Sequence, residues 1–159
     1  MQLAELFSAD DLILPFEATD KWDAIRRLVD HLVDEGRVDA SKGEEIHDAI
    51  LARERSMSTG MEQGIAIPHA AVDDLDDVVA CMGIVRSDDG IQFESVDGRP
   101  TRIVVLLVIP RAKKLLHIRT LADIARVLSR DSVRDALLGA EDEQAAWRLL
   151  GEGEAAAQA

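Results

Sequence analysis

The chain has 159 residues, with 47% hydrophobic and 31% charged side chains and a formal net charge of −13. This length suits one soluble domain, and the excess of acid argues against binding to nucleic acid or to anionic membrane surfaces. The longest apolar run, residues 103–109, is far shorter than the ~20 residues of a membrane helix, so membrane insertion is not expected. A single cysteine, Cys81, excludes an internal disulfide, and a cytoplasmic location is expected. The acidity serves either solubility or the docking of a basic partner.

The N-terminal part of the chain predicts a short helix over residues 2–7 and a strand over residues 12–14. Thr19 and Asp20 are both suited to cap the helix that follows. Apolar residues recur at helical spacing along this second helix, and Gly36 is expected to end it.

Ser41, with Glu44 three residues later, predicts a capping box at the start of the next helix. This helix is expected to reach Arg53 near its C-terminal end. A polar, glycine-containing loop over residues 56–64 then leads into an apolar strand that begins at Ile65.

Two apolar segments in the second half, residues 78–85 and 101–109, predict buried strands. The second segment is an unbroken run of β-branched residues and leucine, so helices are expected on both of its faces. A long helix follows, with shorter helices near Val133 and Trp147. The residues of the long helix expected to face inward are Ile118, Leu121, Ala122, Ala125 and Leu128.

The order of these elements predicts a single-domain, layered α/β fold with a central mixed, mostly parallel sheet and helices on both faces. The domain is expected to span residues 1–150. Residues 151–159 offer little to bury and are expected to form a flexible tail. In such sheets ligands bind beyond the carboxyl ends of the strands, and His69 and the loop over residues 110–117 are expected at two such ends.

The histidines differ in their surroundings. His31 and His47 each lie between the polar and apolar faces of a predicted helix, and solvated positions are expected for both. His69 follows the apolar residues 65–67 and Pro68, whose ring fixes the direction of the backbone. A histidine at the end of a rigid strand is preorganised as a nucleophile or ligand. The alternative is a structural histidine that is hydrogen-bonded to a neighbouring loop.

His117 lies in the first turns of the long predicted helix, on a face that turns toward the sheet. Lys113 and Lys114 precede it, although the dipole at a helix N-terminus repels cations. These lysines therefore indicate either a visiting anion or ordinary solvated loop residues.

Motifs for other chemistries are absent from the sequence. No His-x-x-x-His or Cys-x-x-Cys pair is present, so no metal site is expected. The glycine-rich loops of nucleotide-binding proteins and the Gly-x-Ser-x-Gly motif of serine hydrolases are absent as well. The sequence therefore predicts chemistry that needs no metal or cofactor.

The segment ARERSMSTGMEQGIAIPHA, residues 52–70, resembles the active-site segment of the type-2 enzyme IIA domains of the phosphoenolpyruvate-dependent sugar phosphotransferase system. This is the fructose and mannitol class, which includes the nitrogen-regulatory IIA proteins. The resemblance extends to FESVDGRPTRIVVLLVIP, residues 93–110, and to HIRTLADIARVL, residues 117–128. It covers nearly the whole chain, and Ala-Ile-Pro-His with an upstream Arg and Ser-Thr-Gly is a specific motif.

The resemblance implies that His69 accepts a phosphoryl group from the phosphocarrier HPr or a relative of it, and that Arg53 and His117 flank the phosphohistidine. The chemistry of the residues agrees, because a neutral imidazole, with a reference pKa of about 6.5, is a nucleophile near neutral pH. The planar guanidinium of Arg53 suits phosphate oxygens. The hydroxyl groups of Ser58 and Thr59 are expected to supply further donors. His117 is expected to donate a hydrogen bond or to orient the ring of His69.

Two residues depart from the family pattern. Glu62 stands where relatives usually have a glycine, and Met57 precedes Ser58 where glycine is frequent. A carboxylate near an incoming phosphoryl group repels it unless the side chain points to solvent. These changes bear on the efficiency of phosphoryl transfer and not on the identity of the acceptor.

Two functions are consistent with these features. The first is a phosphohistidine carrier that passes the phosphoryl group to a downstream IIB domain, or signals to a regulated protein through its phosphorylation state. The single-domain length favours the nitrogen-regulatory branch, although a transport IIA made as a separate chain has the same appearance. The alternative is an interaction domain with the IIA fold in which Glu62 has weakened phosphoryl transfer.

Overall fold

A five-stranded sheet forms the centre of the protein in the computed structural model, which describes residues 3–158. The strands are β1 (Leu12–Ile13), β2 (Ile65–Ala66), β3 (His69–Val72), β4 (Val79–Ile84) and β5 (Ile103–Pro110). Their order is β1-β4-β5-β2, and β3 also pairs with β5. Among the described strands only the β4–β5 pair is antiparallel, so the sheet is mixed and mostly parallel, as the sequence predicts.

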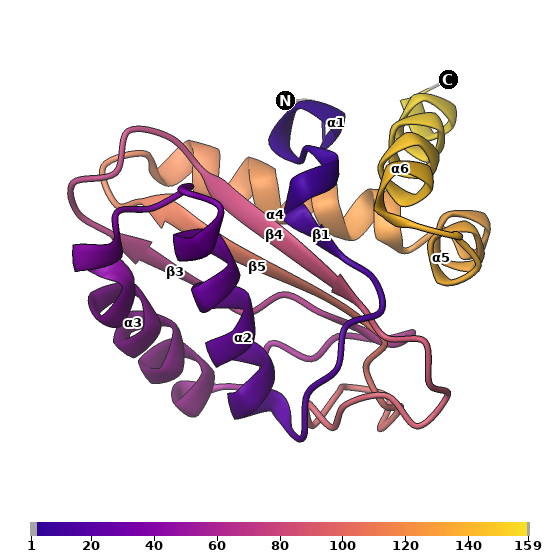
Figure 1. Cartoon of the computed structure of the whole chain (residues 1–159), viewed down its shortest axis with the longest axis horizontal. Coiled ribbons are helices and arrows are strands. Elements are labelled where there is room, and N and C mark those ends of the chain that lie inside the picture. The colour runs from indigo at the N-terminus through magenta and orange to yellow at the C-terminus, as the bar shows by residue number, and fades with distance from the viewer. Residues whose placement is uncertain (1–2, 159) are drawn as a thin grey trace.

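Helices cover both faces of this sheet (Figure 1). One layer consists of α2 (Lys21–Asp34) and α3 (Gly43–Ser56). The opposite layer consists of α1 (Leu3–Leu6), α4 (Lys114–Leu128), α5 (Asp131–Leu138) and α6 (Glu143–Gln158). Short 3-10 turns precede β1 and α3, at Ala9–Asp11 and Ala40–Lys42. Among the described residues, no helix combines the length and the apolar character that crossing a membrane requires. The predicted layered α/β fold is confirmed.

The central strand β5 is buried along its whole length. Successive side chains of a strand point to opposite faces, so its residues divide between the two layers of the core. Ile103, Val105, Leu107 and Ile109 pack under α1 and α4–α6. Val104, Leu106 and Val108 pack under α2 and α3. This division explains the unbroken apolar run in the sequence.

The predicted limits of α2 are confirmed at both ends. The carboxylate of Asp20 accepts the backbone N–H of Asp23 at 2.8 Å and caps the first turn. Gly36, just beyond the last turn, has a φ of 69°, which favours glycine. His31 on this helix was expected at a solvated flank; it is half-buried, and its Nε2 lies 2.7 Å from the carbonyl oxygen of Asp10 in an exposed place.

The predicted capping box of α3 is wrong. Asp39 accepts the backbone N–H of Ser41 at 2.9 Å and starts a 3-10 turn, after which α3 begins at Gly43 without a side-chain cap. The carboxylate of Glu44 instead pairs with Arg26 of α2 at 2.7 Å. An ion pair across the two helices therefore replaces the local bond that the spacing predicts.

The predicted inward face of α4 is wrong in part. The buried residues of this helix are Thr120, Ile124, Val127 and Leu128. Ile118 is 65% exposed, and Ala122 is exposed as well. Residues 114–119 include no fully buried side chain, so the first turns of α4 reach beyond the core. The helical spacing of apolar residues in these turns is therefore not a sign of contact with the sheet.

The segment predicted to be a flexible tail belongs to α6, which continues through Gln158; the first residue of the predicted 2–7 helix and residue 159 lie outside the described residues. Glu154 is 1% exposed, and its carboxylate accepts the backbone N–H of Leu3 at 2.5 Å. A Cβ atom on Gly153 would lie 2.6 Å from Cγ2 of Val133. The lack of a side chain at Gly153 therefore allows α6 to approach α5 closely.

Candidate functional site

His69 lies at the junction of two short strands that both run parallel to β5. The sequence predicts this residue at the carboxyl end of one strand, but β2 ends at Ala66 and His69 begins β3, in register with Leu107. The break follows from Pro68, which has no N–H for the ladder. Its carbonyl oxygen still accepts the N–H of Leu107 at 3.0 Å, so the backbone is fixed on both sides of the junction.

A hydrogen bond sets the tautomer of the His69 ring. Nδ1 lies 2.8 Å from the carbonyl oxygen of Ile67. Because a carbonyl only accepts hydrogen bonds, Nδ1 must donate, and Nε2 carries the lone pair of the neutral ring. Burial lowers the pKa of His69 below its usual 6.5, and the neighbouring Arg53 and His117 lower it further, against the opposing effect of the Ile67 carbonyl. The ring is therefore neutral and nucleophilic near neutral pH.

His117 lies beside this ring, as the sequence predicts. The centroids of the two imidazoles are 5.4 Å apart, and the planes meet edge to face at 71°. Of the two lysines before it, Lys113 donates from Nζ to the backbone carbonyl of Asp76 at 2.6 Å, and Lys114 is exposed. Lys113 therefore fastens a neighbouring loop, while Lys114 stays accessible to an anion.

A cavity of about 400 Å³ opens at His69, and Arg53 is part of its wall. Nη1 of Arg53 donates to the carbonyl oxygen of Met57 at 2.8 Å, which holds the guanidinium beside the loop. The guanidinium of Arg55 instead lies over the ring of Trp22, 6.0 Å from its centroid. The two arginines of this segment thus have different surroundings, and Arg53 is the one that lines the cavity.

Ser58 and Thr59 line the same cavity, but both hydroxyl groups already have acceptors. The Ser58 hydroxyl donates to the carbonyl oxygen of Phe93. The Thr59 hydroxyl donates to the carboxylate of Glu54 at 2.8 Å, and the backbone N–H of Thr59 donates to the same carboxylate at 2.7 Å. In this structure the two hydroxyl groups shape the wall of the cavity instead of projecting free donors into it.

Glu54 is a site residue that the sequence reasoning missed. It is 2% exposed and holds Thr59 from within the protein. The sequence carries one signal for Glu54, which is that it directly follows Arg53 and lies on the buried side of the helix. Glu62, by contrast, is exposed and does not line the cavity, so its charge faces solvent.

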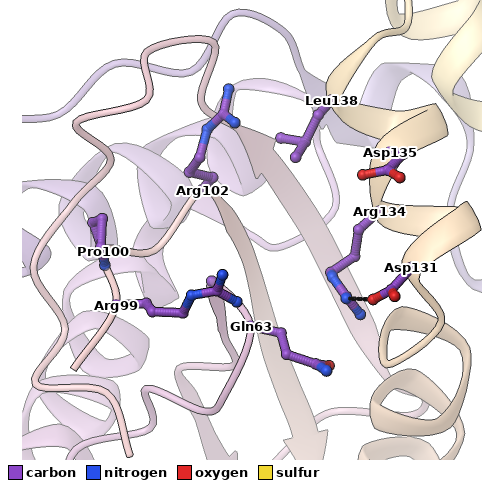
Figure 2. A pocket seen from close by; sticks show the side chains of 9 residues that line it. Gln63, Arg99, Pro100, Arg102, Asp131, Arg134, Asp135 and Leu138 are labelled. Atoms are coloured by element: carbon purple, nitrogen blue, oxygen red, sulfur yellow. Dashed lines mark hydrogen bonds and ion pairs between the residues drawn. The ribbon is translucent and has the colours of Figure 1, made fainter. Parts of the chain in front are cut away.

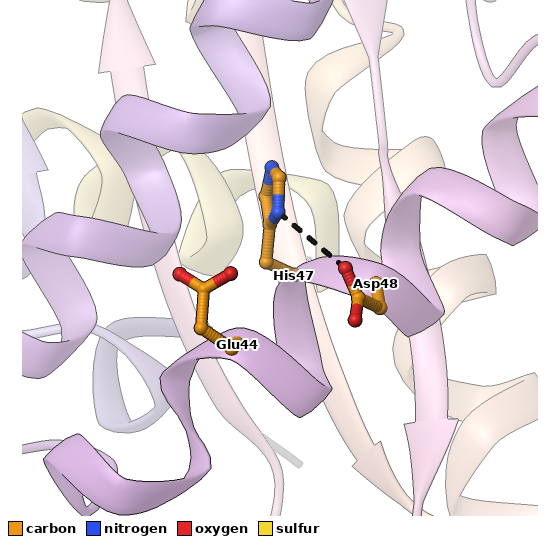
Figure 3. A group of neighbouring side chains, drawn as sticks. All are labelled: Glu44, His47 and Asp48. Atoms are coloured by element: carbon orange, nitrogen blue, oxygen red, sulfur yellow. Dashed lines mark ion pairs between the residues drawn. The ribbon is translucent and has the colours of Figure 1, made fainter.

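A second group of polar side chains lies near the start of α3, where Glu44, His47 and Asp48 place possible metal ligand atoms within 4.8 Å of one another (Figure 3). His47 was expected to be solvated, but it is 8% exposed, its Nδ1 has no hydrogen-bond partner among the described residues, and burial lowers its pKa. Arg26 donates to Glu44 at 2.7 Å and supplies the cationic charge at this place. The group is apart from Arg53, which lies in the last turn of the same helix.

Comparison with known proteins assigns the chain to a family. The model of the family described as "Phosphoenolpyruvate-dependent sugar phosphotransferase system, EIIA 2" matches residues 5–153. The chain belongs to this family. This EIIA 2 protein is 36% identical over 132 residues to the "PTS system fructose-specific EIIA component" of Haloferax volcanii, with 83% of each chain covered. It is 27% identical over 150 residues to the "Nitrogen regulatory protein" of Bradyrhizobium diazoefficiens, covering 94% of this chain and 95% of that one.

A longer relative and two solved structures are also similar to this chain. The chain is 32% identical over 145 residues to the "PTS system fructose-specific EIIABC component" of Bacillus subtilis and spans 22% of that protein's length. The fold is similar to that of the nitrogen regulatory protein IIA-Ntr from Neisseria meningitidis, with a TM-score of 0.82, 22% identity, and 93% and 98% of the two chains covered. The IIA mannitol structure from Escherichia coli gives a TM-score of 0.74 at 25% identity, with 91% and 98% covered. The resemblance identified in the sequence is confirmed.

Proposed function

We propose that this EIIA 2 protein is a phosphoryl carrier in which Nε2 of His69 accepts a phosphoryl group from an HPr-like donor in the cytoplasm. The observation that carries the proposal is the hydrogen bond from Nδ1 of His69 to the Ile67 carbonyl. This bond leaves Nε2 unprotonated on a ring that lines a cavity. An imidazole with a lowered pKa is in its reactive form without the help of a separate base.

In the transfer step, the P–N bond of the donor phosphohistidine breaks as Nε2 of His69 bonds to phosphorus. The donor ring, protonated on its other nitrogen, keeps the electron pair of the broken bond and leaves as a neutral imidazole. Nδ1 of His69 keeps its proton, and the positive charge that develops on the ring is stabilised by the Ile67 carbonyl. Positioning and charge stabilisation are the main contributions a protein makes to such a transfer.

Arg53 and His117 supply these contributions. Arg53 has guanidinium N–H groups beyond the one that bonds to Met57, and they are donors for the equatorial oxygens of the moving phosphoryl group. His117 is close enough to His69 to donate a hydrogen bond to a phosphoryl oxygen. Ser58 and Thr59 act on the phosphate indirectly, because their hydroxyl groups fix the loop that lines the cavity.

Exposed apolar side chains next to these residues provide a docking surface for donor and acceptor proteins. Met57, Leu115 and Ile118 are 70%, 73% and 65% exposed. Met57 bonds to Arg53 through its carbonyl oxygen, while Leu115 and Ile118 flank His117 in the sequence. Apolar groups exposed together beside a reactive site are typical of surfaces that bind another protein.

The acceptor that we propose is a IIB domain or a regulated protein. The chain is similar both to a fructose-specific EIIA component and to nitrogen regulatory proteins, and we infer one kind of acceptor from each of these names. The alternative function, an interaction domain with weakened transfer, depends on Glu62 opposing the phosphoryl group. The exposure of Glu62 outside the cavity favours the carrier.

Incubation with phosphoenolpyruvate, enzyme I and HPr tests the proposal. We expect an acid-labile phosphoryl adduct on the wild-type protein, no adduct on His69→Ala, and a slower but complete reaction for His117→Ala. An adduct that persists in His69→Ala would exclude the site. No adduct on the wild type with a matched donor would favour the interaction domain.

A further inference from the structure

A second cavity lies at the far end of the loop that shapes the phosphorylation site (Figure 2). Its volume is about 460 Å³. Ser58 and Met61 line the His69 cavity, whereas Gln63 and Gly64 line this one. The two cavities share no lining residue and are therefore separate places.

Three arginines line this second cavity, in a protein whose net charge is −13. Arg99 and Arg102 come from the segment that leads into β5, and Arg134 comes from α5. Figure 2 shows the guanidinium of Arg99 extending toward the cavity from the side opposite α5. Two of these guanidinium groups are ion-paired, Arg102 with Asp88 and Arg134 with Asp131, so Arg99 carries the cationic charge that is open to an anion.

The donors of these arginines are not all used. Arg134 is 9% exposed and is held by the Leu128 carbonyl at 2.8 Å and by Asp131. Arg102 donates to the Arg86 carbonyl at 2.7 Å and pairs with Asp88 at 3.3 Å, while its Nε is buried and has no hydrogen-bond partner among the described residues.

Arg99 is the accessible member of the three. Its guanidinium makes no hydrogen bond or ion pair within residues 3–158. Unsatisfied guanidinium donors at a cavity are suited to a phosphate, whose oxygens accept several N–H bonds at once.

The opposite wall of the cavity carries carboxylates. Asp131 and Asp135 both line it from α5. Asp131 is paired with Arg134, whereas Asp135 makes no side-chain hydrogen bond or ion pair in the part of the chain that the structure describes. A bare anion gains nothing from this carboxylate. A ligand with hydroxyl groups donates to it while its phosphate faces Arg99.

The backbone around this cavity is fixed before any ligand arrives. The carbonyl oxygen of Gly64 accepts the N–H groups of Arg102 at 2.9 Å and Ile103 at 3.0 Å. The N–H of Gln63 donates to the carboxylate of Asp97 at 2.8 Å. The loop and the start of β5 are therefore held together, which lowers the cost of ordering on binding.

We propose that this cavity binds a small organic phosphate ester, with the phosphate at Arg99 and Arg102 and with hydroxyl groups of the organic part at Asp135. The ester is a sugar phosphate or a nucleoside monophosphate, since both present a phosphate and hydroxyl donors. Its binding does not require phosphorylation of His69.

Titration of the full chain with glucose 6-phosphate and with adenosine 5′-monophosphate, followed by backbone NMR, tests this proposal. We expect saturable shifts at Gln63 and Gly64 for at least one ester. Arg99→Gln is expected to weaken binding by roughly tenfold, and Asp135→Asn by a smaller factor. Arg148→Gln, which changes an exposed arginine of α6 outside the cavity, and His69→Ala are expected to bind as the wild type does.

Ligands that lack either the organic part or the phosphate test the two halves of the proposal separately. Weaker binding of inorganic phosphate and of gluconate than of the ester supports it, because each lacks one half of the recognised chemistry. Equal binding of inorganic phosphate or gluconate would overturn it, as would no saturable binding of either ester. Loss of the shifts in His69→Ala would place the ligand at the phosphorylation site and would overturn it too.

Discussion

The ring of His69 is held by its own strand, through the bond from Nδ1 to the carbonyl of Ile67 two residues earlier. The bond orients the imidazole and assigns its proton without a separate side chain. Burial, together with the neighbouring Arg53 and His117, keeps the pKa of the ring below its usual 6.5. Nucleophilicity at this residue is therefore a consequence of backbone geometry and desolvation.

The pH dependence of phosphorylation follows from this pKa. Because the neutral ring is the nucleophile, we expect the rate to fall as the pH falls through the lowered pKa of His69 and to be flat above it. NMR titration of the ring should give a midpoint below 6.5, and His117→Ala should raise this midpoint by removing a neighbour that lowers the pKa of His69. A midpoint at or above 6.5 in the wild type would contradict the account.

Arg53 and Arg55 provide a matched pair of variants. Arg53→Ala is expected to slow phosphoryl transfer roughly 100-fold, since it removes a charged donor from the wall beside His69. Arg55→Ala, whose side chain lies over Trp22, should change the rate by less than about twofold. Single-turnover rates with a phosphorylated donor measure both, and equal rates for the two variants would refute the role of Arg53.

At this scale the sequence predicts which residues gather, but not how their hydrogen bonds are made. The family resemblance implies that Arg53 and His117 flank His69, and the structure places both near its ring. The acceptor of the Ser58 hydroxyl, by contrast, is the carbonyl of Phe93 on a distant segment. A bond between residues far apart in the chain leaves no local pattern in the sequence.

At the scale of elements, α3 and the loop after it act together through Glu54. This buried carboxylate accepts two hydrogen bonds from Thr59 and so fixes the loop to the helix that carries Arg53. The orientation of the cavity wall relative to the guanidinium depends on this contact.

Glu54→Gln is expected to lower the free energy of unfolding by about 1–3 kcal/mol, because the amide cannot accept both bonds from Thr59 without burying an unmatched N–H. Phosphorylation should slow as well, since the wall beside His69 loosens. Chemical denaturation and the phosphorylation assay measure the two effects. Glu62→Gln is the control, because Glu62 is exposed and should leave stability within about 0.5 kcal/mol of the wild type.

The ends of a helix could be predicted from the sequence where a local pattern sets them. They could not be predicted where tertiary contacts set them. Asp20 and Gly36 mark the ends of α2 because capping is a local interaction. Ser41 and Glu44 have the spacing of a capping box, but the pairing of Glu44 with Arg26 across two helices takes precedence. Ile118 is exposed because the first turns of α4 reach past the core. The periodicity of apolar residues does not show how far a helix extends beyond the core.

At the scale of the whole molecule, the last helix joins the two ends of the chain. The carboxylate of Glu154 on α6 receives the N–H of Leu3 on α1, and Gly153 allows the contact with α5. The layered fold could be predicted from the order of apolar segments. The packing of residues 151–158 could not, because it depends on a fit to Val133 and Leu3.

Removal of residues 151–159 is expected to lower the free energy of unfolding by at least about 2 kcal/mol, because it leaves a buried N–H of α1 without its acceptor. Glu154→Ala should show most of this loss, and Glu152→Ala, at an exposed position of the same helix, should change stability by less than about 0.5 kcal/mol. A truncated protein as stable as the full chain would restore the expectation of a flexible tail.

The central claim is that Nε2 of His69 is the atom that receives phosphorus. The most direct measurement is nitrogen and phosphorus NMR of the protein labelled in its histidine rings, before and after treatment with phosphoenolpyruvate, enzyme I and HPr. The account predicts a P–N coupling to Nε2 of His69, with the proton still on Nδ1. Coupling to Nδ1, or to a ring nitrogen of His117, would contradict it.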